Sequence, residues 1–237
     1  DMRQIRERSG FDLDRCDEIE LETRHDLMAF VRCMSEFVSG RRLQSGEVPP
    51  EGTPSRWIHF GVTSYDVIDT ALGMMMRDSI DVLLGSLDRL GDGLGALMER
   101  AGTHPCIGRT HGIHAEPITF GHKVDGWIHE IDRSRSRLEA AKREIAVGKI
   151  SGPVGIHAHV SPEMEAAICE RLGLCADPNS TQIVARDRHA SVLCAMALLA
   201  GSLERIATEL RNLQRTEILE VQEEFAKGQT GSSAMPH

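Results

Sequence analysis

The feature that most constrains the fold of this sequence is a long apolar repeat that runs from Val67 to about Gly102. Apolar side chains recur there at three- and four-residue steps, namely Val67, Ile68, Leu72, Met75, Met76, Ile80, Leu83, Leu84, Leu87, Leu90, Leu94 and Leu97. This spacing places them on one face of an α-helix about ten turns long. A helix of that length indicates an extended bundle or the core of an oligomer.

Four further segments show helical periodicity. Three of them are long, residues 12–40, 120–145 and 186–225, and one is short, residues 161–172. Almost no strand pattern is present. Aromatic residues make up only 4% of the chain, so the core must consist of Leu, Ala, Ile, Val and Met, which suits helix-on-helix packing. The sequence therefore predicts an all-α fold.

Composition excludes several classes of protein. The net charge of −9 argues against a protein that binds nucleic-acid phosphates, although a local site for a small anion needs only a few cations or helix ends. Six cysteines without C-x-x-C spacing indicate reduced thiols. We find no signal peptide and no apolar run that would span a bilayer, so we expect a soluble, cytoplasmic protein without a membrane partner. Both ends lack a closing element, and we expect a fragment or an interrupted chain.

The densest group of chemically active side chains lies between Gly108 and Gly121. Two histidines, an arginine, a carboxylate and two hydroxyls gather there: Arg109, Thr110, His111, His114, Glu116 and Thr119. A helical pattern follows at once, so we expect this group at or just before a helix N-terminus, where it could bind an anion or transfer a proton. The alternative is a solvated polar loop.

Two smaller groups of polar residues can also be interpreted either as structural features or as parts of a binding site. His25 and Asp26 are adjacent within the predicted helix 12–40, where such a pair is often only a polar surface feature. Thr63, Ser64 and Asp66 form a strong N-cap signal for the long helix. Capping alone accounts for them, but their hydroxyls and the bare backbone N–H groups also suit a carboxylate or phosphate.

Three separated stretches taken together resemble the fumarase/aspartase superfamily of lyases. They are Thr23-x-His25-Asp26, Gly108-Arg-Thr-His111-Gly-x-His-Ala-Glu-Pro117 and Gly231-Ser-Ser-Ala-Met-Pro-His237. Within the superfamily the chain looks most like the adenylosuccinate lyase family. The resemblance implies a long-helix bundle whose central helices form the core of a homotetramer, with active sites shared between subunits. It also implies that residues 1–60 belong to the N-terminal helical domain and 61–237 to the central bundle, with the C-terminal domain outside the sequence.

The reaction that the resemblance implies is a β-elimination in purine biosynthesis. Fumarate would leave adenylosuccinate to give AMP, and would also leave the succinylated aminoimidazole carboxamide ribotide. His111 would act as general acid and Ser232, or less readily Ser233, as the base on a mobile loop, while His25 would bind the substrate near His111. Residues implied in substrate binding are Arg24, Asp26, Thr63, Ser64, Thr110 and Gln182. The small-molecule substrate would need no cofactor or metal.

Several alternatives stay open. Within the superfamily these are argininosuccinate lyase, aspartase and carboxymuconate cycloisomerase, although the last tends to lack the Thr-His pair found at His111. A non-catalytic helical scaffold is the alternative from another class. The family's loop continues past His237 with basic residues and an Asn, and its phosphate-binding residues lie before Asp1. These 237 residues would therefore not make a complete active site.

Overall fold

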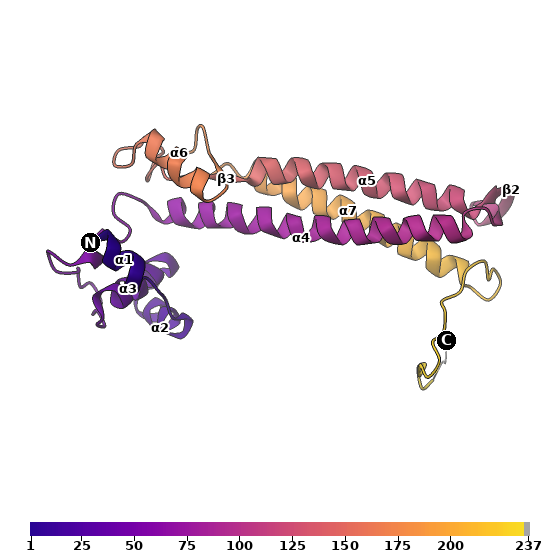
Figure 1. The fold of residues 1–237 in the computed structure, drawn as a ribbon, viewed down its shortest axis with the longest axis horizontal. Helices are drawn as coiled ribbons and strands as arrows, with labels where there is room; N and C mark the ends of the chain where they lie inside the picture. Colours follow the sequence, from indigo (N-terminus) through magenta and orange to yellow (C-terminus); the bar gives the residue numbers. More distant parts are fainter. Residues whose placement is uncertain (235–237) are drawn as a thin grey trace. The chain divides into compact units, whose positions relative to one another are not determined.

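The computed structural model describes residues 1–234 and is built mainly of α-helices, as the sequence predicts (Figure 1). The backbone forms two compact units. Unit 1 comprises Asp1–Ser79 and Lys142–His189, and unit 2 comprises Ile80–Ala141 and Ala190–His237. Three long helices contribute residues to both units: α4 (Ser64–Ala101), α5 (Phe120–Ile145) and α7 (Asp187–Leu213). The long helix predicted from the apolar repeat is thus confirmed as α4.

The remaining elements are short. Unit 1 also contains α1 (Met2–Arg8), α2 (Leu13–Thr23), α3 (Asp26–Ser39), a 3-10 turn η1 (Pro54–Trp57), α6 (Pro162–Arg171) and the parallel strands β3 (Val147–Gly148) and β4 (Cys175–Ala176). Unit 2 also contains the antiparallel hairpin of β1 (Pro105–Thr110) and β2 (Ile113–Thr119). The predicted short helix is confirmed as α6, whose N-cap is Ser161, with Pro162 at its first position.

The core of unit 2 follows directly from the helical spacing of its apolar residues. In α4, buried Ile80, Leu87 and Leu94 recur every seven residues and form one stripe. Matching stripes on the other two helices are Val124, Trp127, Ile131 and Leu138 of α5, and Val192, Ala195, Leu199 and Ile206 of α7. Ion pairs from α4 to α5 (Asp88 with Arg135) and from α5 to α7 (Glu130 with Arg205) show that these helices are neighbours in this unit.

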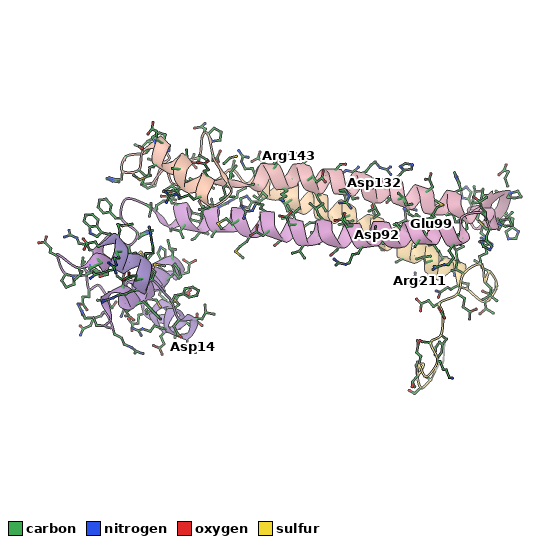
Figure 2. The ribbon with its side chains drawn as sticks, in the orientation of Figure 1. Asp14, Asp92, Glu99, Asp132, Arg143 and Arg211 are labelled. Atoms are coloured by element: carbon green, nitrogen blue, oxygen red, sulfur yellow. The ribbon has the colours of Figure 1, made fainter. Side chains whose placement is uncertain are left out.

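The outward faces of these helices carry both charged and apolar side chains. On α4 and α5 charged side chains such as Asp92, Glu99 and Asp132 are exposed to solvent (Figure 2). Large apolar side chains are exposed as well, Met75 and Val82 on α4 and Leu193 and Leu198 on α7. An 18-residue window of α7 has a mean hydropathy of 1.5, and 28% of it is buried. By length and composition it is the one helix among residues 1–234 that could cross a membrane, contrary to our expectation that the sequence has no such run.

The sequence predicts one helix over residues 12–40, but the structure has two, α2 and α3. Arg24 ends α2 in the left-handed region with φ of 52°. His25 then has extended backbone, and its Nδ1 accepts a hydrogen bond from the Met28 N–H at 3.3 Å as the N-cap of α3. The segment between α2 and α3 contains no Gly or Pro. The apolar periodicity of the sequence continues through it, so periodicity gives no sign that a helix ends there.

The segment around His111 is also different from the prediction. Instead of a polar loop leading into a helix, it is a β-hairpin, with Thr110 opposite Ile113 and Pro105 opposite Thr119. Its backbone bonds are satisfied across the hairpin rather than along a helix. The helix predicted to follow does begin, at Phe120.

The last helix is shorter than the periodicity predicts, because α7 ends at Leu213 and not near Phe225. The N–H groups of Glu220 and Val221 turn back and donate to the Leu213 carbonyl at 3.0 and 3.4 Å. Acidic residues follow closely here, at Glu217, Glu220, Glu223 and Glu224. Negative charge is unfavourable at a helix C-terminus, where the backbone dipole is itself negative, so continued helix is disfavoured.

Candidate functional site

His111 lies at the tip of the β1–β2 hairpin, in a two-residue loop with Gly112. Both residues have positive φ, 54° at His111 and 76° at Gly112, which is the mark of a type I′ turn. Gly adopts this conformation without steric cost, and His is one of the few other residues enriched in it. The short turn therefore defines the backbone conformation of His111 and presents its exposed imidazole at the end of the hairpin.

The strand that leads to His111 is held from the side by an ion pair. Arg109 Nη2 donates to Glu220 Oε1 at 2.6 Å, and the two side chains are only 19% and 18% exposed. The hydrogen bond from Arg109 to this carboxylate is the main reason why the pKa of Arg109 is raised. The hairpin has a bulge between Ile107 and Arg109, next to this contact.

A polar cavity of about 390 Å³ lies beside the hairpin in unit 2. Arg109 and His114 of the hairpin line it together with Lys123, Glu209 and Arg215. Lys123 and Glu209 are themselves paired at 2.7 Å across α5 and α7. His114, which the sequence analysis selects together with His111, therefore lies in a cavity lined by positively and negatively charged side chains.

In unit 1 the break between α2 and α3 presents Arg24, His25 and Asp26, all exposed. Because His25 Nδ1 accepts the Met28 N–H as a helix cap, Nε2 is the nitrogen that carries the proton in the neutral ring. The Asp26 carboxylate lies 3.4 Å from the same Nδ1. The geometry therefore leaves Nε2 of His25 as a hydrogen-bond donor for a ligand.

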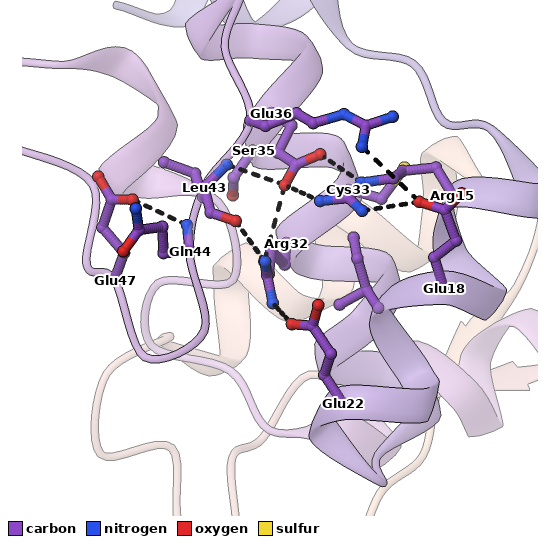
Figure 3. Close-up of polar contacts among 12 residues, drawn as sticks. Arg15, Glu18, Glu22, Arg32, Cys33, Ser35, Glu36, Leu43, Gln44 and Glu47 are labelled. Carbon is purple, nitrogen blue, oxygen red and sulfur yellow. Dashed lines mark hydrogen bonds and ion pairs between the residues drawn. The ribbon is translucent and has the colours of Figure 1, made fainter.

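A buried charge network holds this break in place (Figure 3). Glu36 of α3 accepts two bonds from Arg15 of α2, each at 2.9 Å, and one from the Leu43 N–H at 2.9 Å. Arg32 of α3 reaches Glu22 of α2 at 2.8 Å and also donates to the Leu43 carbonyl. Burial alone would raise the pKa of Glu36, but the hydrogen bonds from Arg15 and Leu43 outweigh it and lower that pKa. The network thus fixes α2 against α3 on either side of His25.

The N-terminus of α4 is capped by a carboxylate and not by the hydroxyls. Asp66 Oδ2 accepts the Thr63 N–H at 2.7 Å, the backward half of a capping box. Within the part of the chain that the structure describes, neither the Thr63 nor the Ser64 hydroxyl forms a hydrogen bond. Both hydroxyls are therefore free to bind a ligand at this helix end, where the dipole favours an anion.

The structure adds His59 to this end of unit 1, a residue that the sequence analysis did not select. Its φ is 67°, and its Nδ1 is buried without a hydrogen-bond partner among residues 1–234. Burial lowers the pKa of His59, with Asp66 acting in the opposite direction and the charge of His25 in the same direction. His59 is therefore electrostatically coupled to both. Its place four residues before Thr63, in His-Phe-Gly-Val-Thr, is the sequence signal that could have found it.

The predicted site residues divide between the two units. Unit 1 holds Arg24, His25, Asp26, Thr63, Ser64 and Gln182, and unit 2 holds Thr110, His111, Ser232 and Ser233. Gln182, Thr110, Ser232 and Ser233 are all exposed. Ser232 Oγ accepts the Ala234 N–H at 3.4 Å, and the rest of the predicted motif, Met235 to His237, lies outside the described residues. Among residues 1–234 no three His, Cys, Asp or Glu side chains converge in a way that could hold a metal ion.

Comparison with known proteins shows that this chain is similar to lyases. A family model described as lyase matches residues 2–237. Adenylosuccinate lyase of Synechocystis sp. is 48% identical over 99% of this chain and 51% of its own length. Adenylosuccinate lyase of Bacillus subtilis is 46% identical over 100% of this chain and 52% of its own length. The chain therefore spans about half the length of the curated relatives that it matches.

A solved structure supports the fold. The 3-carboxy-cis,cis-muconate lactonizing enzyme from Pseudomonas putida matches with a TM-score of 0.80 and 28% identity, over 96% of this chain and 49% of that chain. Its identity to this sequence is well below that of the two adenylosuccinate lyases. The arrangement of long helices is thus retained at a lower sequence identity than that to the adenylosuccinate lyases.

Proposed function

Because this chain belongs to the lyase family, within the fumarase/aspartase superfamily, we propose that the protein eliminates fumarate from adenylosuccinate to give AMP. The same site would act on the succinylated aminoimidazole carboxamide ribotide of purine biosynthesis. The observation that carries this proposal is the match to adenylosuccinate lyases along the whole chain, with His111 exposed at the hairpin tip.

The elimination needs an acid at the departing nitrogen and a base at the carbon next to a carboxylate. We assign the acid to His111, whose fixed backbone supports the alignment that proton transfer requires. We assign the base to Ser232 in preference to Ser233. A hydroxyl is a weak base in water, so the Gly-Ser-Ser loop must close over the substrate and place N–H dipoles around the alkoxide.

Substrate binding is assigned to groups that the structure leaves free. The Thr63 and Ser64 hydroxyls at the start of α4 suit a carboxylate, and His25 Nε2 suits a neutral or anionic acceptor. Arg24, Asp26, Gln182 and Thr110 are exposed and complete the proposed contacts. All roles in this mechanism are assigned to groups of the protein itself, and we propose a reaction that uses no metal or cofactor.

We also propose a homotetramer with shared active sites, in the cytoplasm, with residues 61–237 as its central bundle. The exposed Leu193, Met196 and Leu198 on α7 support this, because large apolar side chains clustered on one helix indicate a surface that another chain covers. The same residues would face lipid if α7 crossed a membrane. Leu198→Glu separates the two: it would reduce the mass of the particle in light scattering if the face joins copies in solution.

The test of the activity uses the full-length protein, because this chain spans about half the length of its curated relatives, and it follows fumarate release from adenylosuccinate by the change in purine absorbance. His111→Asn is the matched variant, because Asn tolerates the positive φ of this position and removes the imidazole. We expect wild type to turn over and the variant to bind substrate with its turnover reduced by about 100-fold or more. Wild-type inactivity here, with turnover of argininosuccinate, aspartate or carboxymuconate, would assign another reaction of the superfamily. Inactivity on all of them would favour the helical scaffold.

A further inference from the structure

The start of α4 has only half of a capping box. Asp66 accepts the Thr63 N–H at 2.7 Å, but the Thr63 hydroxyl does not accept an N–H of the first turn in return. Within residues 1–234 the N–H groups of Ser64 and Tyr65 have no acceptor. This helix end therefore keeps two hydroxyls and two N–H groups as free donors, while Asp66 brings a negative charge that would repel an anionic ligand there.

Lys149 supplies the positive charge that cancels the charge of Asp66. Its Nζ donates to Asp66 Oδ1 and to the Gly152 carbonyl, and both charged side chains are fully buried. The backbone of Lys149 is held against α4 as well. Its N–H donates to the Thr70 hydroxyl at 2.9 Å, and that hydroxyl donates to the Lys149 carbonyl at 3.1 Å. Because Thr70 lies one turn after Asp66, the ammonium group is fixed beside the start of the helix.

The other acidic residue in the first two turns of α4 is also neutralised. Asp69 is buried, and its carboxylate accepts from the Val184 N–H at 2.8 Å and from Arg186 at 3.0 Å. The Arg186 side chain is 44% exposed, so water screens this pair more than it screens Lys149 and Asp66. Asp66 is also nearer to the free hydroxyls along the helix. Lys149 is therefore the cation with the greater effect on the charge at this end.

Stability alone does not account for the pair. Apolar side chains of similar volume often replace a buried ion pair without loss, and a hydroxyl can cap a helix without burying any charge. The arrangement found here leaves the Thr63 and Ser64 hydroxyls uncommitted and cancels the charge of the acid beside them. A site for a carboxylate needs this combination, because the ligand then meets hydrogen-bond donors and no competing negative charge.

We propose that Lys149 sets the anion affinity of the start of α4 by neutralising Asp66. It is a positioning residue, because it acts through Asp66 and does not touch the ligand. This inference rests on the proposed function, from which it takes the binding of a substrate carboxylate at Thr63 and Ser64. All the groups involved lie in unit 1, so the effect does not depend on which subunit supplies His111 or the serines.

The test measures the Kd of fumarate by isothermal titration calorimetry, with the full-length protein and two variants of opposite charge. Lys149→Met leaves the negative charge of Asp66, and we expect Kd to rise by about 10- to 100-fold, as for a unit charge at short range in a partly dry site. Asp66→Asn leaves the positive charge of Lys149, and we expect Kd to fall by about threefold or more. A purely structural role would instead weaken binding in both variants, since either change disrupts the same contacts.

Three further variants serve as controls, each measured at a temperature at which circular dichroism shows it to be folded. The double variant Asp66→Asn with Lys149→Met restores a neutral pair, and its Kd is expected within about threefold of wild type. Arg171→Gln removes one positive charge from an exposed position on α6 in the same unit, and its Kd stays within about twofold. Thr63→Ala raises Kd several-fold, which locates the ligand at the start of α4.

Each outcome decides the role of Lys149. Weaker binding in both single variants would overturn it, and so would wild-type affinity in Lys149→Met. If Lys149→Met does not fold, the double variant is compared with Asp66→Asn, which differs from it only at residue 149. Equal Kd values in that comparison would also overturn the role.

The proposed function is tested separately by turnover of adenylosuccinate. If wild type is inert on it but binds fumarate with the expected charge dependence, the proposed reaction fails and the role of Lys149 stands. If wild type turns over and the Kd of fumarate does not follow the charge, the reaction stands and the role of Lys149 fails.

Discussion

Lys149 and Asp66 form an ion pair in which both side chains are completely buried. The lysine Nζ also donates to the Gly152 carbonyl at 2.6 Å, and Asp66 accepts the N–H groups of Thr63 at 2.7 Å and Gly152 at 3.2 Å. One buried pair therefore ties the N-terminus of α4 to the loop after β3. Each charge depends on the other, since an ion without its partner in this environment is strongly destabilising.

Replacement of one partner is expected to be costly. Lys149→Met leaves the Asp66 carboxylate buried without its cation, and we expect the free energy of unfolding to fall by about 3–5 kcal/mol. Chemical denaturation measures this loss, with Lys227→Met at an exposed position as the control that changes it by less than about 0.5 kcal/mol. The double variant Asp66→Asn with Lys149→Met is expected to lose less than the two single losses combined. A loss below about 1 kcal/mol in Lys149→Met would contradict the assigned burial of the pair.

The Glu36 network predicts a dependence of stability on pH. Because the pKa of Glu36 is lowered in the folded state, its contribution is fully present above its ordinary pKa of 4.5 and is lost as pH falls below that value. We expect Glu36→Gln to reduce the free energy of unfolding by about 2–3 kcal/mol at pH 7. The difference from wild type is expected to shrink towards pH 3. An equal difference at both pH values would show that the charge of Glu36 plays no part.

His59 is predicted to stay neutral at pH 7. Its pKa is lowered mainly by burial, so protonation opposes folding, and stability is expected to decrease as pH falls below the ordinary value of 6.5. NMR titration of the imidazole protons measures the effect directly, with the urea-unfolded chain as reference. His59→Asn, which tolerates the positive φ, is expected to flatten the pH dependence of stability in this range. A midpoint at or above 6.5 in the folded protein would refute the prediction.

Two glycines give predictions of opposite sign. Gly112 has φ of 76° with no atom near its missing side chain, so Gly112→Ala introduces strain without a clash and is expected to cost about 1–2 kcal/mol. Gly126 lies within α5, also in open space, and Gly126→Ala is expected to stabilise by about 0.5–1 kcal/mol. Thermal unfolding of the two variants checks both. If Gly112→Ala were also stabilising, the hairpin turn would not have the assigned conformation.

The long helices could be predicted from sequence because their periodicity is sustained. In α4 the stripe of Ile80, Leu87 and Leu94 continues past several glycines without a break. The ends and turns were harder to predict. The corner at Arg24 depends on a left-handed residue that is not glycine, and the end of α7 at Leu213 is followed by another at Leu219 and by backbone bonds from Glu220 and Val221 to the Leu213 carbonyl, none of which apolar periodicity indicates.

The candidate site, too, could be predicted from the sequence only in part. Motif resemblance selects His25, His111 and the two serines, but it gives no conformation for them. The hairpin was missed because its turn dipeptide is His-Gly and not Asn-Gly, and its strands lack a clean apolar alternation. His59 was missed because its buried nitrogen is a property of packing, although its place four residues before Thr63 could have drawn attention to it.

The two-residue turn at His111 limits how the length of this sequence can vary among natural relatives. Successive residues of a strand point to opposite faces, so one inserted residue in Ile113–Thr119 would turn His114 and Glu116 away from their present sides. The loop of residues 44–53, which follows the anchored Leu43 and has no strand partner, carries no such constraint. Insertions and deletions are therefore expected to accumulate between residues 44 and 53 and to be rare between 105 and 119.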